Sequence, residues 1–88
     1  MRVDLRGKRY EFRKFRSQRH WGECDDPRTP GKEIRIERSL KEDSPEFLET
    51  VIHEALHGLF PDLKEEAVDE SSRSLRVLLW RLGFRKAV

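Results

Sequence analysis

The sequence predicts an α+β fold, in which a small, mainly antiparallel sheet is followed by two helices that cover one of its faces. In the first half of the chain, apolar and polar residues alternate in short segments, whereas in the second half apolar residues recur every three or four positions. The change falls near Ser44-Pro45, a pair that typically opens a helix. Strands that precede helices, instead of alternating with them, are typical of α+β domains.

The first half of the chain is predicted to form strands. Residues 3–5 and 10–15 alternate roughly between apolar and polar, and the residues between them have turn character, which predicts a hairpin. Residues 20–25 follow, and a loop rich in proline and glycine comes next, at residues 26–31. Residues 33–37 alternate strictly and form the clearest predicted strand of the chain.

A first helix is predicted from residue 45 to residue 59. Ser44 supplies a hydroxyl cap, Pro45 suits the first helical position, and an acid follows in the first turn. Gly58 and Pro61 are expected to end this helix. The face that packs on the sheet is predicted to consist of Leu48, Val51, Ile52, Ala55 and Leu59.

A second helix is predicted after a short turn. Asp62 to Glu65 has the pattern of a capping box that would open this helix, and Gly83 would close it. Its apolar stripe, which is expected to face the core, consists of Val68, Ser71, Leu75, Leu78, Leu79 and Leu82.

The composition bounds the class of protein. The 88 residues are expected to form one domain spanning residues 1–88, with a thin core that a metal site would help to stabilise. A net charge of +2 is too small to imply a nucleic-acid partner, and the basic residues of segment 2–19 are expected to be solvated. The sequence shows no membrane-spanning run and no signal-peptide pattern, which predicts a cytoplasmic protein.

The motif that carries chemistry is His53-Glu54-Ala55-Leu56-His57, an H-E-x-x-H sequence inside the first predicted helix. Residues four apart lie one turn above each other, so His53 and His57 leave the same face and can bind one ion, for which zinc is expected. Glu54 is rotated by roughly 100° from His53. It therefore stays outside the ligand set and is placed to accept a proton from a metal-bound water.

Two histidines leave a zinc site incomplete, because catalytic zinc sites use three protein ligands and a water. The candidates for the third ligand are His20, Cys24, Glu65, Glu66, Asp69 and Glu70. On a helical wheel Glu65 and Asp69 flank the apolar stripe, whereas the other two acids of the second helix lie nearer its opposite side. This placement favours Glu65 as a ligand and Asp69 as an acceptor for the N–H of a ligand histidine. Glu65 also has a competing interpretation as part of the capping box.

Residues 53–57 (HEALH), followed by residues 65–69 (EEAVD), resemble the gluzincin branch of the zincin metallopeptidases. In that branch H-E-x-x-H is followed by E-x-x-x-D on a second helix. The whole chain is similar to a minimal zincin core, as in small metalloproteases of bacteria and phages. Gluzincins also place a strand antiparallel to the bound substrate just ahead of the active-site helix, and residues 20–25 and 33–37 are the candidates for it here.

The resemblance implies roles for particular residues. His53, His57 and Glu65 would hold one zinc ion, Glu54 would be the general base and acid, and Asp69 would orient a ligand histidine. The expected function is that of a zinc-dependent metallopeptidase, a hydrolase that acts on a protein or peptide substrate through a metal-activated water.

Two other classes of function compete with this expectation. A non-catalytic zinc-binding domain with a structural or regulatory role is the main alternative, and a fourth protein ligand such as Cys24 or His20 would favour it. The basic segment 2–19 and its aromatic residues could stack on nucleic-acid bases, but these aromatics alternate as core-facing strand residues do, which argues against a nucleic-acid partner. Trp21 and Trp80 are expected to be packing residues.

Overall fold

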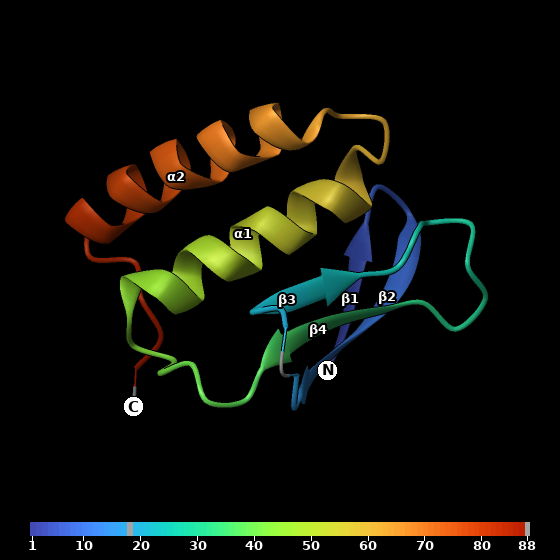
Figure 1. Ribbon diagram of the computed structural model, residues 1–88, viewed down its shortest axis with the longest axis horizontal. Coiled ribbons are helices and arrows are strands. Elements are labelled where there is room, and N and C mark those ends of the chain that lie inside the picture. Colours follow the sequence, from blue (N-terminus) through green and yellow to red (C-terminus); the bar gives the residue numbers. More distant parts are fainter. Residues whose placement is uncertain (18, 88) are drawn as a thin grey trace.

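The computed structural model describes residues 1–17 and 19–87, which form a four-stranded sheet followed by two helices (Figure 1). The elements, in chain order, are β1 (Arg2–Leu5), β2 (Lys8–Phe15), β3 (Gly22–Cys24), β4 (Glu33–Glu37), α1 (Pro45–Leu59) and α2 (Glu65–Arg81). The predicted α+β class and the predicted order of elements are confirmed.

The sheet has the strand order β1-β2-β4-β3. The β1–β2 and β3–β4 pairs are antiparallel, as predicted, whereas β2 and β4 pair in parallel at the centre of the sheet. The parallel pair arises because the chain leaves β2, forms β3 at the far edge and then returns as β4 between them. β3 is therefore an edge strand, and β4 is an interior one.

The predicted hairpin joins β1 to β2 through a two-residue turn. Arg6 has a φ of 52° and Gly7 a φ of 80°. Two successive positive φ values define the turn type whose twist matches that of the flanking strands, and glycine adopts the second at little cost. The turn fixes the register in which Val3 lies opposite Tyr10.

The core lies between the sheet and α1. Tyr10, Ile34 and Ile36 are at most 3% exposed, and Phe47 and Val51 of α1 pack against them. Alternation along β4 places its two isoleucines on this inner face and its charged residues on the other. Burial of each large apolar side chain stabilises the fold by roughly 1.5–3 kcal/mol, so this small cluster holds α1 in place.

The bounds of α1 agree with the predicted range of residues 45–59, whereas Gly58, which was expected to help end the helix, lies within its last turn. Ser44 Oγ accepts a hydrogen bond from the Phe47 backbone N–H at 3.1 Å. Gly58 lies inside the helix, which continues to Leu59, and it is buried. A Cβ at this position would lie 2.8 Å from the Leu5 side chain, so Gly58 allows the helix to approach the sheet closely.

The capping box predicted at the start of α2 is absent. Lys64 is the N-cap residue and makes no side-chain capping bond, so Glu65 is the first residue of the helix. A capping box would need Glu65 at the third position of the helix, two residues further in. Its carboxylate is therefore free to point away from the helix end.

The predicted apolar stripe of α2 is also wrong in part. Val68 is fully buried, but Leu75, Leu78 and Leu82 are 39%, 54% and 63% exposed, and the buried line continues instead through Ser72. The reason is that α2 packs on α1 and not on the sheet, so that α1 lies between the two (Figure 1). Contact with a single helix buries only a narrow strip of α2.

The loops beside β2 and β4 are joined by a buried acid, Glu37, which is 7% exposed. Its carboxylate accepts hydrogen bonds from the backbone N–H groups of Ser17 at 2.7 Å and Ser39 at 2.6 Å. These donors favour the charged form and hold the pKa of Glu37 below its ordinary value.

Replacing Glu37 by glutamine is expected to destabilise the fold most above about pH 5. A carboxyl group whose pKa is lowered by folding stabilises the native state above its unfolded pKa, and this contribution is lost as the pH falls. The difference in Tm between the parent and Glu37→Gln should therefore narrow as the pH falls from about 6 to about 3. Glu70→Gln, at an exposed position of α2, is the control for loss of one negative charge. A difference in Tm that widens in acid would contradict the prediction.

Candidate metal centre

The two histidines of α1 converge as the motif predicts. His53 Nε2 and His57 Nε2 lie 3.2 Å apart, and the imidazole rings are 4.9 Å apart at an angle of 70°. The four-residue spacing brings them together, because residues four apart lie one turn from each other on the same helix face. Two neutral ring nitrogens that face each other at this distance repel unless a proton or a cation lies between them.

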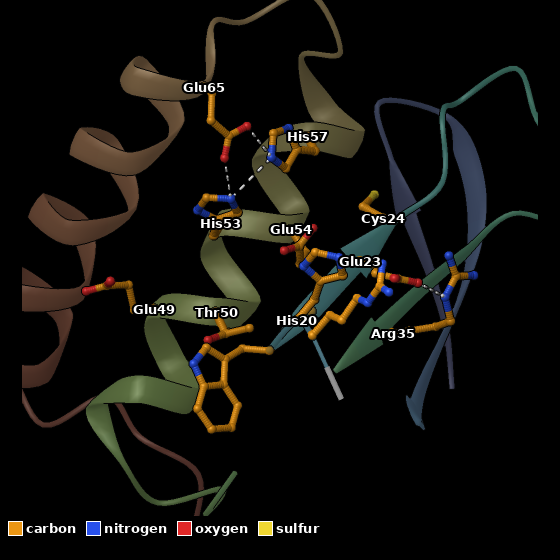
Figure 2. A pocket seen from close by; sticks show the side chains of 13 residues that line it. His20, Glu23, Cys24, Arg35, Glu49, Thr50, His53, Glu54, His57 and Glu65 are labelled. Carbon is orange, nitrogen blue, oxygen red and sulfur yellow. Dashed lines mark hydrogen bonds and ion pairs between the residues drawn. The ribbon is translucent and has the colours of Figure 1, made fainter. Parts of the chain in front are cut away.

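Glu65 completes a group of three residues that can donate a ligand atom to one metal ion. This donor group consists of His53, His57 and Glu65. As the first residue of α2, Glu65 lies beside the end of α1, and its carboxylate points toward both imidazoles (Figure 2). Oε1 lies 3.1 Å from His53 Nε2, and Oε2 lies 3.2 Å from His57 Nε2. The turn between the helices, residues 60–64, is what brings an acid from α2 to this place.

The spacing of the three donors suits a single metal ion. Ligand atoms about 2.0–2.1 Å from a tetrahedral zinc ion lie about 3.3–3.4 Å from one another. The two Nε2 atoms are 3.2 Å apart, and each lies 3.1 to 3.2 Å from one of the two carboxylate oxygens of Glu65, which is close to this edge length. His53, His57 and Glu65 can therefore form one face of a tetrahedron and leave the fourth position open.

Asp69 lies one helical turn after Glu65, on the same side of α2. Its Oδ1 is 3.4 Å from Nδ1 of His53, the ring nitrogen that faces away from the donor group. A carboxylate at this position can accept the Nδ1–H bond and keep Nε2 free to bind a metal. The structure thus brings Asp69 beside one of the two histidines of the motif, His53.

Glu54 lies beside the donor group without belonging to it. It is 8% exposed, and its burial raises the pKa of the carboxyl group to about 7. Gly22 of β3 packs directly against it, because a Cβ on Gly22 would lie 2.8 Å from Glu54 Cγ. Figure 2 shows Glu54 on the side of α1 that faces β3, whereas the imidazoles face Glu65.

An open cleft of about 670 Å³ joins the donor group to β3. It runs between α1 and the edge of the sheet, so a substrate in it would contact both. The cleft is lined by Arg19, His20, Trp21, Gly22, Glu23, Cys24, Arg35, Glu49, Thr50, His53, Glu54, His57 and Glu65.

The other candidate ligands lie outside the donor group. Glu66 and Glu70 are exposed on α2, and neither joins the three donors. His20 and Cys24 line the cleft, but no donor group within the described ranges includes them. Burial raises the pKa of the Cys24 thiol to about 11, so the thiol is protonated at neutral pH.

Sequence reasoning missed the contribution of Trp21 and Gly22 to the cleft. The expectation that Trp21 is a packing residue is wrong, because the residue is 60% exposed and lines the cleft. The alternation of residues in this segment did not predict the exposure of Trp21, because Trp21 precedes β3, which begins at Gly22. The signal for Gly22 was weak but present: a glycine in a strand often marks a close approach of another backbone or side chain.

Comparison of the chain with protein-family models, with curated proteins and with solved structures gives no match. The geometry of the donor group and of its cleft is therefore what indicates a function for this chain. Neither helix of the described residues has the length and apolar character needed to cross a membrane.

Proposed function

We propose that this chain is a single minimal zincin-like domain that hydrolyses peptide bonds with one zinc ion. His53, His57 and Glu65 would be the ligands, Glu54 the general base and acid, and Asp69 the acceptor that orients His53. The observation that carries the proposal is the convergence of His53, His57 and Glu65: the two Nε2 atoms lie 3.2 Å apart, and each lies 3.1 to 3.2 Å from one oxygen of the Glu65 carboxylate. A buried carboxylate outside this group, that of Glu54, lies beside it in the same cleft.

The choice of zinc follows from the chemistry of the donors. Two imidazole nitrogens and one carboxylate, with a fourth position open, are the ligand set of catalytic zinc in several hydrolases. When bound, zinc polarises a substrate carbonyl and brings the pKa of a coordinated water close to 7.

The residues around the metal centre would carry the proton through the reaction. Glu54 accepts a proton from the attacking water and then donates it to the nitrogen of the departing amine. Its burial and its raised pKa suit both halves of this cycle, because the group must exist in both protonation states near neutral pH. Asp69, whose Oδ1 lies 3.4 Å from Nδ1 of His53, would favour the tautomer that leaves Nε2 unprotonated.

The free edge of β3 is suited to an extended peptide. The backbone N–H of Glu37 donates to the Trp21 carbonyl, and the N–H of Asp25 donates to the Glu33 carbonyl. The backbone groups of Trp21 and Asp25 therefore point toward β4. Along a strand these directions alternate, and the backbone groups of Gly22 and Cys24 therefore point to the open edge. Added as a further strand, a peptide would form main-chain hydrogen bonds there and pass beside Glu54.

Removal and restoration of zinc tests the proposal. The purified protein is expected to bind one zinc ion, and zinc-free protein should regain cleavage of unstructured peptides when one equivalent is added. At a free zinc concentration of about 100 times Kd the fold should gain about 2.7 kcal/mol, a rise in Tm of about 10–20 °C. Metal content, calorimetry and mass spectrometry of a peptide mixture measure these effects.

The possible outcomes separate the proposal from its main alternative. Zinc binding at one to one with a large rise in Tm, but with no peptide cleaved, would favour a non-catalytic zinc domain. Unchanged melting with and without chelator would contradict both. Within the described residues the donor group has three members, so the fourth protein ligand that a closed structural site needs is not among them.

A further inference from the structure

A second hollow adjoins the metal-site cleft at the start of β3, and its volume is about 590 Å³. It shares Arg19, His20 and Trp21 with the cleft, and Arg16 and Arg38 form part of its other walls. Because the shared residues lead directly into β3, the two hollows meet where the free edge of that strand begins.

This second hollow has a surplus of positive charge. Arg16, Arg19 and Arg38 are exposed, and none of them forms an ion pair with another residue of the described ranges. The carboxylate in the same hollow, that of Glu37, already accepts hydrogen bonds from two backbone N–H groups. By contrast, Arg35 on the outer face of the sheet is paired with three acids.

Guanidinium groups gathered around a concave surface are suited to a carboxylate, because the planar fork of arginine matches its two oxygens. Trp21, exposed at the boundary between the two hollows, offers a flat surface over which an extended chain can pass. The hollow therefore has the features of a recognition site for an acidic segment of a substrate that already lies in the cleft.

The direction of β3 fixes which part of the substrate would reach these arginines. Antiparallel pairing is slightly more stable per residue than parallel pairing, so a peptide on the free edge of β3 is expected to run antiparallel to it. Its C-terminal part would then lie at the start of β3, over Trp21 and beside the arginines.

We infer that this arginine-lined hollow binds a carboxylate on the C-terminal side of the scissile bond, which makes acidic peptides the preferred substrates. The inference rests on the proposed peptidase function for the position of the bond. The carboxylate can belong to an aspartate or glutamate side chain or to the C-terminus of the peptide, since the recognition chemistry is the same.

Binding of labelled octapeptides tests this inference without requiring turnover. One glutamate is moved through an otherwise neutral peptide, each version is matched by a glutamine version, and each is made with a free and with an amidated C-terminus. Affinity for zinc-loaded Glu54→Gln protein is measured by fluorescence anisotropy. We expect glutamate in the C-terminal half to bind about fivefold to tenfold more tightly than glutamine, with less discrimination at high salt.

Variants of the arginines identify the source of the preference. The double variant Arg16→Gln/Arg38→Gln should lose it, whereas Arg73→Gln on α2, which removes one positive charge and lines none of the hollows described, should keep it. If a glutamine peptide with a free C-terminus binds as tightly as the glutamate peptide, and its amidated version does not, the terminal carboxylate is the group that is bound. Equal affinity for all versions, a preference that survives in the double variant, or a preference for acid in the N-terminal half would overturn the inference.

The same peptides separate this inference from the proposed function. Cleavage of the neutral peptide by the parent protein, with no preference for acid, would contradict the inference and leave the peptidase proposal standing. Tighter binding of acidic peptides through the arginines, without cleavage of any peptide, would support the carboxylate site and contradict the peptidase proposal.

Discussion

Replacing Glu54 by glutamine is expected to lower kcat for peptide hydrolysis by about 100- to 10,000-fold while zinc remains bound. Glutamine has the same shape as glutamate but cannot accept a proton, so the substitution removes the base and leaves the packing against Gly22 intact. Because Glu54 lies outside the donor group, the affinity for zinc should stay close to that of the parent. Steady-state kinetics and metal analysis of the same preparations measure both quantities.

The control for this variant is Glu66→Gln. Glu66 is an exposed acid at the start of α2, outside the donor group, and its replacement likewise turns one carboxyl group into an amide. Glu66→Gln should keep both zinc and activity. Parental rates in Glu54→Gln would show that another group moves the proton, and loss of zinc from Glu54→Gln would show that Glu54 is a ligand.

Replacing His53 or His57 by alanine is expected to weaken zinc binding by more than about a hundredfold. Each variant removes one of three ligands, whereas loss of a partner that only orients a ligand typically costs about 10- to 100-fold in affinity. Glu65→Gln should have an effect like that of the histidine variants, and Asp69→Asn should have the smaller effect of an orienting partner. Competition with a chromophoric chelator measures the affinities, and circular dichroism shows whether each variant is folded.

The order of these affinities is the informative result. If Glu65→Gln binds zinc as tightly as Glu66→Gln, Glu65 is not a ligand and the third donor must lie elsewhere. If Asp69→Asn weakens binding more than Glu65→Gln does, the roles of the two acids on α2 are reversed.

Local patterns determined most of the elements. Alternation in residues 33–37 and the Ser44-Pro45 start of α1 depend on backbone geometry within a few residues, so the sequence predicts them well. The convergence of His53 and His57 has the same local origin, because a four-residue step along any α-helix brings two side chains to one face. The metal-binding chemistry of the motif could therefore be predicted from the sequence, without knowledge of the residues that surround it in the fold.

The tertiary structure alone decided how α2 lies and where its acids are placed. In the sequence Glu65 fitted a capping box as well as a ligand, and only the position of the helix start after Lys64 separates the two. The outward position of Leu75 follows from packing on α1 instead of on the sheet. Neither feature has a short-range signature, because each depends on where another element lies.

The sequence by itself thus determined the fold class, the two histidines on one helix face and the neighbouring Glu54. The tertiary structure decided that the carboxylate of Glu65 lies beside both imidazoles, that β3 is the free edge beside Glu54, and that a positively charged hollow extends the cleft. The physical reason is the separation along the chain of the residues that interact. The geometry of one helix is set by hydrogen bonds four residues apart, whereas the distance between two elements is set by the packing of side chains far apart in the chain.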